Sequence, residues 1–360
     1  MSTTRYTIRP LATVLSAVIL MAVASVTLAA QDRINVVTTL TTYADIARQI
    51  GGDLVEVTAI ADAAENPHSV QPKPSLVLAV KRADMLITTG LDLELWLPAL
   101  MDKAANRKVA SGAPGFVAAA PGVKLMDVPV TLSRSEGDSH VFGNHHIWTE
   151  PVNAVVIGLN VLAGFKRVDP ANADYYQQRY TEWKDEVMRA LVGSDLVELL
   201  GADLLHDLDR EGELWGFLTT QSYQGQQLAD RVGGWLGQTR HLRGREMACY
   251  HKAWSYVTRT FGVTCAAYVE PKPGLPPTPR HVAEVISVIN ERSLAVLFTA
   301  AYYNRDQVEL VERRTGARAV MIPLNVGAVP NTETFIDLIS HWVDELTAAF
   351  GDNTTVDSRP

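Results

Sequence analysis

Short runs rich in β-branched residues alternate with amphipathic helical patterns over most of this 360-residue chain. Such βαβ alternation is typical of parallel sheets whose faces are covered by helices. In a first block, strands are expected at 34–40, 55–60 and 85–90, with helices at 42–50, 75–83 and 94–105. In a second block, strands are expected at 246–251, 263–269, 295–300 and 317–324, with helices at 253–261, 280–292, 305–315 and 332–349. The pattern predicts an α/β fold built in two parts.

The segment between the two blocks contains a long amphipathic helix. Asp169 and Pro170 form a typical helix start, with Asp as N-cap and Pro in the first turn. Apolar residues then follow one helical face, at spacings of 4, 3, 4 and 4: Tyr176, Tyr180, Trp183, Val187 and Leu191. The helix is expected to bridge two lobes, although a surface helix of a single domain fits the same pattern. Residues 193–244, which follow it, are less regular.

The first thirty residues differ in composition from the rest. Arg5 and Arg9 precede an uncharged apolar stretch at 11–28, and alanines occupy positions 29 and 30. A basic start, an apolar middle and small residues at the end are typical of a cleavable secretory signal, with a membrane anchor as the alternative. No cysteine follows the expected cut, so no lipid anchor is expected, and no later segment is apolar enough to predict a membrane span. We expect a soluble mature protein outside the cytoplasm.

The charge of the mature chain excludes one class of partner. Removing residues 1–30 takes away two arginines and no acidic residue, which leaves 30 basic against 40 acidic residues and a net charge of −10. Such an acidic chain is not expected to bind nucleic acid.

Two cysteines, Cys249 and Cys265, fall on successive predicted strands. A lone pair in an oxidising compartment favours a disulfide. The alternative is a thiolate metal site, which usually needs more cysteines or a closer spacing.

Four of the nine histidines stand out by position: His68, His145, His146 and His251. His68 follows a predicted strand, His251 ends one, and the other two lie where a polar loop meets a helix. Ligands of open α/β sheets bind beyond the carboxyl ends of strands, so histidines of the two blocks can face each other across a cleft. Imidazoles in this arrangement suit zinc, copper, nickel or iron. Four others, His206, His241, His281 and His341, are expected at the surface.

Four segments carry a further pattern, in the order NPHSVQPKPS (66–75), HHIWTEPVNA (145–154), YHKAWSYVTRTFG (250–262) and VEPKPGLPPTPRH (269–281). Together they resemble the zinc- and manganese-binding solute-binding proteins of bacterial ABC importers, the ZnuA/TroA-like type. The similarity covers nearly all of the expected mature chain. It implies two α/β lobes, each with a mainly parallel sheet flanked by helices, joined by one long linker helix, with the metal site in the interlobe cleft.

The resemblance also implies a set of ligands. His68 matches the first ligand, His146 the second and His251 the third. His145 is the weaker candidate for the second position, because His146 keeps the register of the motif with Trp148. A histidine at the third position goes with zinc in such proteins and a carboxylate with manganese, which agrees with the preference of oxygen ligands for harder ions.

The fourth position departs from the family pattern. The family usually supplies an Asp just before a Pro-Leu-Gly-like turn, and Ile322 stands there in this chain. An acid that some relatives carry near Ala300 is also missing. Glu65, His140 or water is therefore expected to complete the coordination.

The resemblance predicts a periplasmic, non-enzymatic monomer that binds one Zn²⁺ and delivers it to the membrane permease of an ABC transporter. Alternatives are manganese or iron binding on the same scaffold, a zinc-dependent hydrolase or hydratase with a water on three histidines, and an adhesin or metal chaperone. The expected organisation is a signal peptide (1–30), an N-terminal lobe (31–168), a linker helix (169–200), a C-terminal lobe (201–350) and a disordered tail (351–360).

Overall fold

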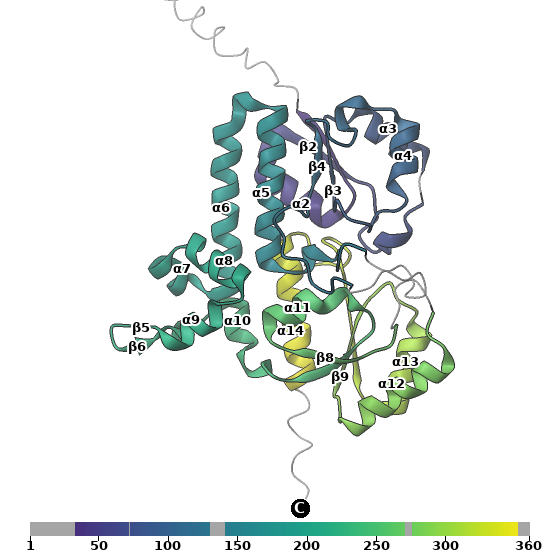
Figure 1. Ribbon diagram of the computed structural model, residues 1–360, viewed down its shortest axis with the longest axis vertical. Coiled ribbons are helices and arrows are strands. Elements are labelled where there is room, and N and C mark those ends of the chain that lie inside the picture. The colour runs from purple at the N-terminus through teal and green to yellow at the C-terminus, as the bar shows by residue number, and fades with distance from the viewer. Residues whose placement is uncertain (1–32, 72, 130–140, 271–275, 352–360) are drawn as a thin grey trace, which may run out of the picture. The chain divides into compact units, whose positions relative to one another are not determined.

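Two four-stranded parallel sheets, each flanked by helices, organise the fold (Figure 1). The computed structural model describes residues 33–71, 73–129, 141–270 and 276–351. The expected signal peptide, His140 and the chain beyond Gly351 lie outside these residues. The predicted fold class, two α/β lobes with a long helix between them, is confirmed.

The N-terminal sheet has the strand order β2-β1-β3-β4. Its strands are β1 (Ile34–Thr38), β2 (Val55–Ala59), β3 (Met85–Thr88) and β4 (Phe116–Ala118). The helices of this lobe are α2 (Thr41–Gly51), α3 (Pro74–Arg82) and α4 (Leu97–Ala104). Strand β3 is buried at all four positions, as expected of a parallel strand covered on both faces. Strand β4 was not predicted, because three residues are too few to show a period.

The C-terminal sheet repeats this topology. Its strands are β7 (Glu246–Cys249), β8 (Thr264–Tyr268), β9 (Val296–Ala300) and β10 (Arg318–Ile322), in the order β8-β7-β9-β10. Its helices are α11 (Ser255–Phe261), α12 (Pro279–Glu291), α13 (Arg305–Thr315) and α14 (Phe335–Gly351). A disulfide joins Cys249 on β7 to Cys265 on β8 with a Cα–Cα distance of 5.5 Å, so the predicted bridge is confirmed.

Two long helices, α5 (Pro151–Val168) and α6 (Ala173–Val192), lie side by side (Figure 1); α5 packs on the N-terminal sheet, and α6 is the long helix between the lobes. The five apolar residues of the predicted α6 face are all buried. The helix begins at Pro170 as predicted, with a 3-10 turn (Pro170–Asn172) that leads into α6, but the side chain of Asp169, which also ends α5, does not act as the predicted N-cap. The Asp169 carboxylate caps no backbone N–H. It accepts hydrogen bonds from the Asn172 amide and the Tyr176 hydroxyl, at 2.7 Å each.

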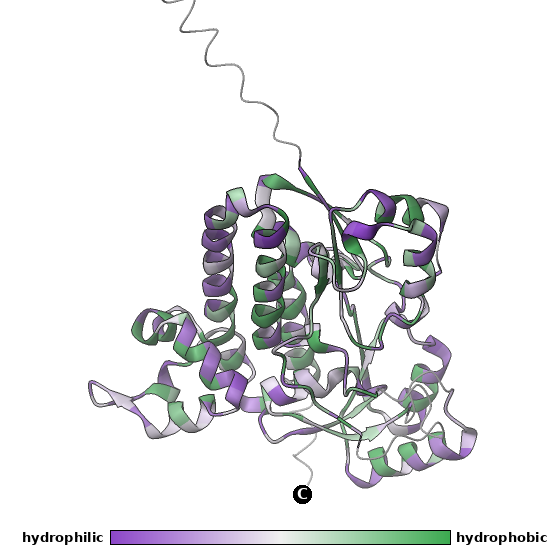
Figure 2. Ribbon diagram, turned by 45° about the horizontal axis from the view of Figure 1, so that its top comes forward, coloured by the Kyte–Doolittle hydropathy of each residue, from purple (hydrophilic) through white to green (hydrophobic). Residues whose placement is uncertain are grey.

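Helix α5 is a core helix. Among the described residues it alone is long and apolar enough to cross a membrane, which the sequence did not indicate, yet 67% of it is buried inside the protein. Figure 2 shows hydrophobic residues along α5 and the strands, whereas α6 carries more hydrophilic ones. The apolar composition of α5 therefore reflects its packing between the N-terminal sheet and α6.

Residues 193–244 form a helical extension at the lower left of Figure 1. It contains α7 (Ser194–Leu200), α8 (Ala202–Glu211), α9 (Leu214–Thr220), the hairpin β5 (Ser222–Tyr223) and β6 (Gln226–Gln227), and α10 (Gly234–Gln238). Gly193 and Gly201 adopt φ angles of 92° and 82°, which favour glycine and separate α6, α7 and α8. The surface prediction for His206 is wrong: this side chain is buried, and its Nε2 lies 3.3 Å from the Val152 carbonyl oxygen.

Hydrogen bonds join the two lobes next to α2. The backbone N–H of Phe335, at the start of α14, donates to the Asp45 carboxylate of α2 at 2.7 Å. The Thr41 hydroxyl donates to the Val326 carbonyl at 2.7 Å, and the Val326 N–H donates to the Thr42 hydroxyl at 3.2 Å. Because these contacts connect the lobes directly, the cleft between them has little freedom to open on this side.

Candidate metal centre

Three of the predicted histidines meet between the two lobes. One ring nitrogen each of His68, His146 and His251 lies within 4.8 Å of the others. His146 and His251 are buried, with exposures of 0% and 2%, and His68 is half-buried. No other group of His, Cys, Asp or Glu side chains in the described ranges gathers as closely.

His68 is positioned by a tight turn after β2. It lies in the 3-10 turn Pro67–Ser69, and its backbone N–H donates to the Asn66 side chain at 3.0 Å. The indole N–H of Trp96 donates to the Pro67 carbonyl at 3.0 Å. The proline and these two bonds hold the turn against the cleft wall.

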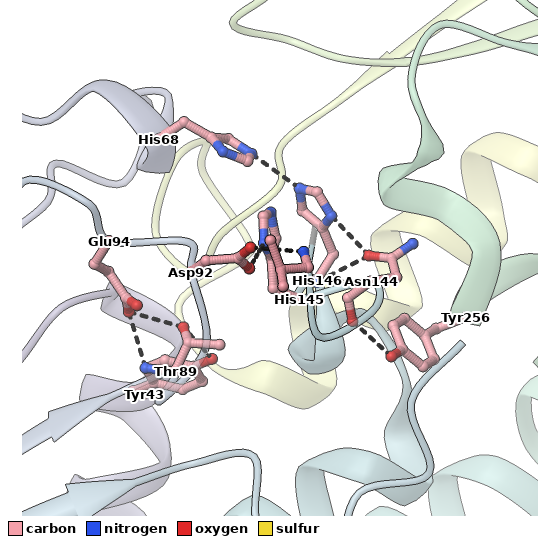
Figure 3. Close-up of polar contacts among 10 residues, drawn as sticks. Tyr43, His68, Thr89, Asp92, Glu94, Asn144, His145, His146 and Tyr256 are labelled. Carbon is pink, nitrogen blue, oxygen red and sulfur yellow. Dashed lines mark hydrogen bonds and ion pairs between the residues drawn. The ribbon is translucent and has the colours of Figure 1, made fainter. Parts of the chain in front are cut away.

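The ring of His146 is held at both nitrogens (Figure 3). Its Nδ1 lies 2.9 Å from Oδ1 of Asn144, and its Nε2 lies 3.2 Å from Nε2 of His68. The Asn144 amide nitrogen donates elsewhere, so its oxygen faces the imidazole and accepts the Nδ1 proton. Nε2 of His146 is then the nitrogen that can bind a metal, and it points at His68.

Asn144 connects the two lobes as well. Its amide nitrogen donates to the Asp127 carboxylate at 2.9 Å and to the Lys252 carbonyl, next to His251, at 2.7 Å. The Tyr256 hydroxyl donates to the Asn144 carbonyl at 2.7 Å (Figure 3). Sequence reasoning missed this residue, because nothing in a polar loop distinguishes one asparagine from its neighbours.

His251 lies just beyond the carboxyl end of β7. The N–H of Tyr250 donates to the Phe298 carbonyl at 2.9 Å, and the N–H of Glu270 donates to the Tyr250 carbonyl at 2.7 Å. The sheet is thus extended up to the site on both sides of His251. Nδ1 of His251 lies 3.1 Å from the carboxylate of Glu270, which sequence reasoning also missed although it lies in the VEPKPG segment.

The other candidate ligands lie outside the trio. Nδ1 of His145 is 3.2 Å from the Asp92 carboxylate, and its ring centroid is 4.9 Å from that of His68 (Figure 3). Burial lowers the pKa of His145, against the opposing effect of Asp92. The Glu65 carboxylate accepts from the Asp62 N–H at 3.3 Å. Ile322 is fully buried at the end of β10.

The trio suits a tetrahedral ion. Zinc binds imidazole at about 2.0–2.1 Å, so two ligands of a zinc tetrahedron are about 3.4 Å apart. The 3.2 Å between the Nε2 atoms of His68 and His146 is close to that length. An all-imidazole set suits zinc and the later transition metals better than the harder manganese.

The fold and the trio together define a metal-binding substrate-binding protein. Residues 36–190 and 226–349 match the model of the family described as zinc-uptake complex component A, periplasmic. The chain therefore belongs to this family of extracytoplasmic components of metal ABC importers. The family comprises transport proteins, which confirms that the chain is not an enzyme. The match leaves out 191–225, the larger part of the helical extension.

Relatives of this chain are named for different metals. The iron-binding protein YfeA of Yersinia pestis is 24% identical over 326 residues, covering 89% of this chain and 87% of the relative. The high-affinity zinc uptake system protein ZnuA of Bacillus subtilis is 26% identical over 156 residues, 43% of this chain and 48% of the relative. The manganese ABC transporter substrate-binding lipoprotein PsaA of Streptococcus pneumoniae is 26% identical over 162 residues, 44% and 49%. The last two matches span about half of each relative.

Solved structures share the fold. A zinc-bound deletion mutant (138–173) of ZnuA aligns with a TM-score of 0.62 at 17% identity, covering 91% of this chain and 100% of the other. A mutant of the laminin-binding adhesin Lmb from Streptococcus agalactiae aligns with a TM-score of 0.63 at 19% identity, covering 88% and 99%.

Proposed function

We propose that this chain captures one Zn²⁺ between His68, His146 and His251 in the periplasm and delivers it to the membrane permease of an ABC importer. The observation that supports this proposal is the meeting of three imidazole nitrogens within 4.8 Å, two of them at the spacing of a zinc tetrahedron. Two of the ligands belong to the N-terminal lobe and one to the C-terminal lobe. Bound metal therefore joins the lobes, and separating them breaks the coordination.

Capture and release need only a modest movement in this proposal. Helix α6 and the hydrogen bonds beside α2 join the lobes, so a small tilt or a loop rearrangement is the motion the fold permits. When contact with the permease draws His251 away from His68 and His146, the metal keeps only two protein ligands. Its affinity for the protein then falls. The protein acts as a monomer in this scheme.

The test is zinc affinity, measured by competition with a chelator, in the parent and in three variants. His68→Ala, His146→Ala and His251→Ala should each weaken zinc binding by about 100-fold or more, at or above the upper end of the effect of losing an outer hydrogen-bond partner. His241→Ala, at an exposed position, is the matched control and should bind like the parent. Parental affinity in all three site variants contradicts the assignment.

Manganese or iron is the alternative cargo, because relatives are named for these ions. Titration of the metal-free protein with zinc, manganese and iron(II) in competition decides between them. The three imidazoles favour zinc over manganese by the Irving–Williams order. A measured preference for manganese over zinc would therefore make manganese the cargo.

Export through a cleavable signal peptide is the other part of the proposal. We expect the mature chain to begin near Gln31 without a lipid, which distinguishes it from relatives named as lipoproteins. Intact mass and N-terminal sequencing of the protein from a periplasmic extract test this. A retained N-terminus in the membrane fraction would indicate an anchor instead.

A further inference from the structure

Glu270 is a buried carboxylate beside the candidate metal centre, with an exposure of 8%. Resting on the proposed function, we propose that Glu270 is the positioning residue of the C-terminal half of the site. It holds the imidazole of His251 through Nδ1 so that Nε2 takes the metal. It also brings next to the site the negative charge that Ile322 does not supply at the usual ligand position.

The backbone places Glu270 against His251. Residues 269 and 270 continue β8 alongside β7, since the N–H groups of Val269 and Glu270 donate to the carbonyls of Cys249 and Tyr250 at 3.0 and 2.7 Å. The disulfide joins the same two strands two residues before His251. The 3.1 Å approach of the carboxylate to Nδ1 is therefore held by the sheet rather than by a free loop.

A third strand supports the carboxylate. Tyr303 follows β9, its ring stacks on Tyr250 at 4.1 Å, and it shares a hydrogen bond with Glu270. A phenol is protonated at neutral pH, so Tyr303 is the donor in this hydrogen bond and the Glu270 carboxylate is the acceptor. The carboxyl ends of β8, β7 and β9 thus contribute Glu270, His251 and Tyr303 to one chain of contacts.

The chemistry of the pair indicates its role. A carboxylate at Nδ1 of an imidazole selects the tautomer with a proton there, leaves Nε2 as the metal-binding atom and makes it a stronger donor. His146 has a neutral amide oxygen in the corresponding place. Three neutral imidazoles leave the charge of a divalent ion uncompensated in a buried site, which is costly. Glu270, one contact away from the metal, reduces this cost.

Zinc affinity and ring tautomer test the proposal together. Glu270→Gln should weaken zinc binding by about 10- to 100-fold, and Glu270→Asp should recover part of the loss because it keeps the charge. In the metal-free protein, nitrogen-15 NMR of the ring should place the His251 proton on Nδ1 in the parent and not preferentially there in Glu270→Gln. Glu94→Gln is the control. It alters a buried carboxylate that accepts from Thr39 and Thr89, and it should change the affinity less than about threefold.

Other outcomes overturn the proposal. If Glu270→Gln keeps the zinc affinity and the His251 tautomer of the parent, Glu270 is not a positioning residue. If His251→Ala still abolishes zinc binding in that case, the proposed function stands without this inference. If the parent binds no zinc, the proposed function fails, and the tautomer in the metal-free protein still decides the role of Glu270. A cobalt(II) spectrum that changes coordination number in Glu270→Gln would make Glu270 a direct ligand and contradict a positioning role. If Glu270→Gln does not fold, Tyr303→Phe tests the same contacts, with an expected loss of about 2- to 10-fold.

Discussion

The two halves of the candidate site are built differently. The N-terminal half offers two histidines whose Nε2 atoms are 3.2 Å apart, and a neutral asparagine orients one of them. The C-terminal half offers one histidine at the edge of a disulfide-bridged sheet, beside a carboxylate. The first half is a nearly formed pair of candidate ligands, and the second offers one candidate ligand on a stiff support. Zinc affinity therefore depends most on the pair in the N-terminal lobe, whereas closure of the cleft depends on His251 in the C-terminal lobe.

Removing one candidate ligand from each half should have the largest effect on zinc affinity. His146→Ala should lower zinc affinity by at least about 1,000-fold, roughly 4 kcal/mol, because it leaves one histidine in each lobe. His251→Ala should cost less, about 100-fold, because the pair in the N-terminal half remains. Chelator competition on both variants, each checked for folding by its melting temperature, measures the order. Equal losses, or a larger loss for His251→Ala, would show that the halves do not differ.

The disulfide distinguishes the halves in stability. Changing Cys249 and Cys265 together to serine removes a bridge with a sequence separation of 16. The loss of this constraint on the unfolded chain should lower the free energy of unfolding by about 3 kcal/mol. Denaturant unfolding of metal-free protein measures the loss, and the parent with its disulfide reduced is the matched control. An unchanged midpoint would mean that the support of His251 does not depend on the bridge.

The fold could largely be predicted because its elements repeat a period over five or more residues. The apolar face of α6 and strands such as β9 carry this information locally. Strand β4, with three residues, does not. The predicted cap failed for another reason: the Asp169 carboxylate accepts from the side chains of Asn172 and Tyr176 instead of the backbone N–H groups that a cap would serve.

The candidate site could be predicted only in part, for a similar reason. His68, His146 and His251 stand at the ends of regular elements and within ordered motifs, so both position and resemblance marked them. Asn144 acts through a carbonyl 108 residues away. Glu270 acts across two strands whose adjacency is a property of the sheet. Contacts of this kind have no period in a sequence, so the groups that hold the ligands emerged only with the structure.

The next prediction concerns Asn144, which holds the N-terminal half of the site against Lys252, the residue after His251. Asn144→Ala removes the acceptor of His146 Nδ1 and the donor to the Lys252 carbonyl. Zinc affinity should fall by about 10- to 100-fold, the range for losing an outer partner of a metal-bound histidine. Asn160→Ala is the matched control, since its amide also donates to two carbonyls but lies away from the cleft. Equal effects of the two variants would assign Asn144 to general stability.

The smallest predicted effect concerns a second link between the halves, the ion pair of Glu150 at the start of α5 with Arg259 on α11, at 2.7 Å. Burial raises the pKa of Glu150 from 4.5 to about 7, although Arg259 opposes the shift. The folded protein therefore binds this proton more tightly than the unfolded chain does. The stability it contributes is complete below pH about 4.5 and is lost as the pH rises through about 7.

Between pH 6 and pH 8 this loss should amount to about 1.4 kcal/mol of unfolding free energy. Denaturant unfolding at several pH values measures the slope. Glu150→Gln keeps an oxygen for Arg259 but cannot titrate, so its stability should change less over the same interval. A parental slope in this variant would exclude Glu150 as the cause. A flatter slope with unchanged zinc affinity would show that this link stabilises the contact between the lobes without acting on the ligands, in contrast to Asn144.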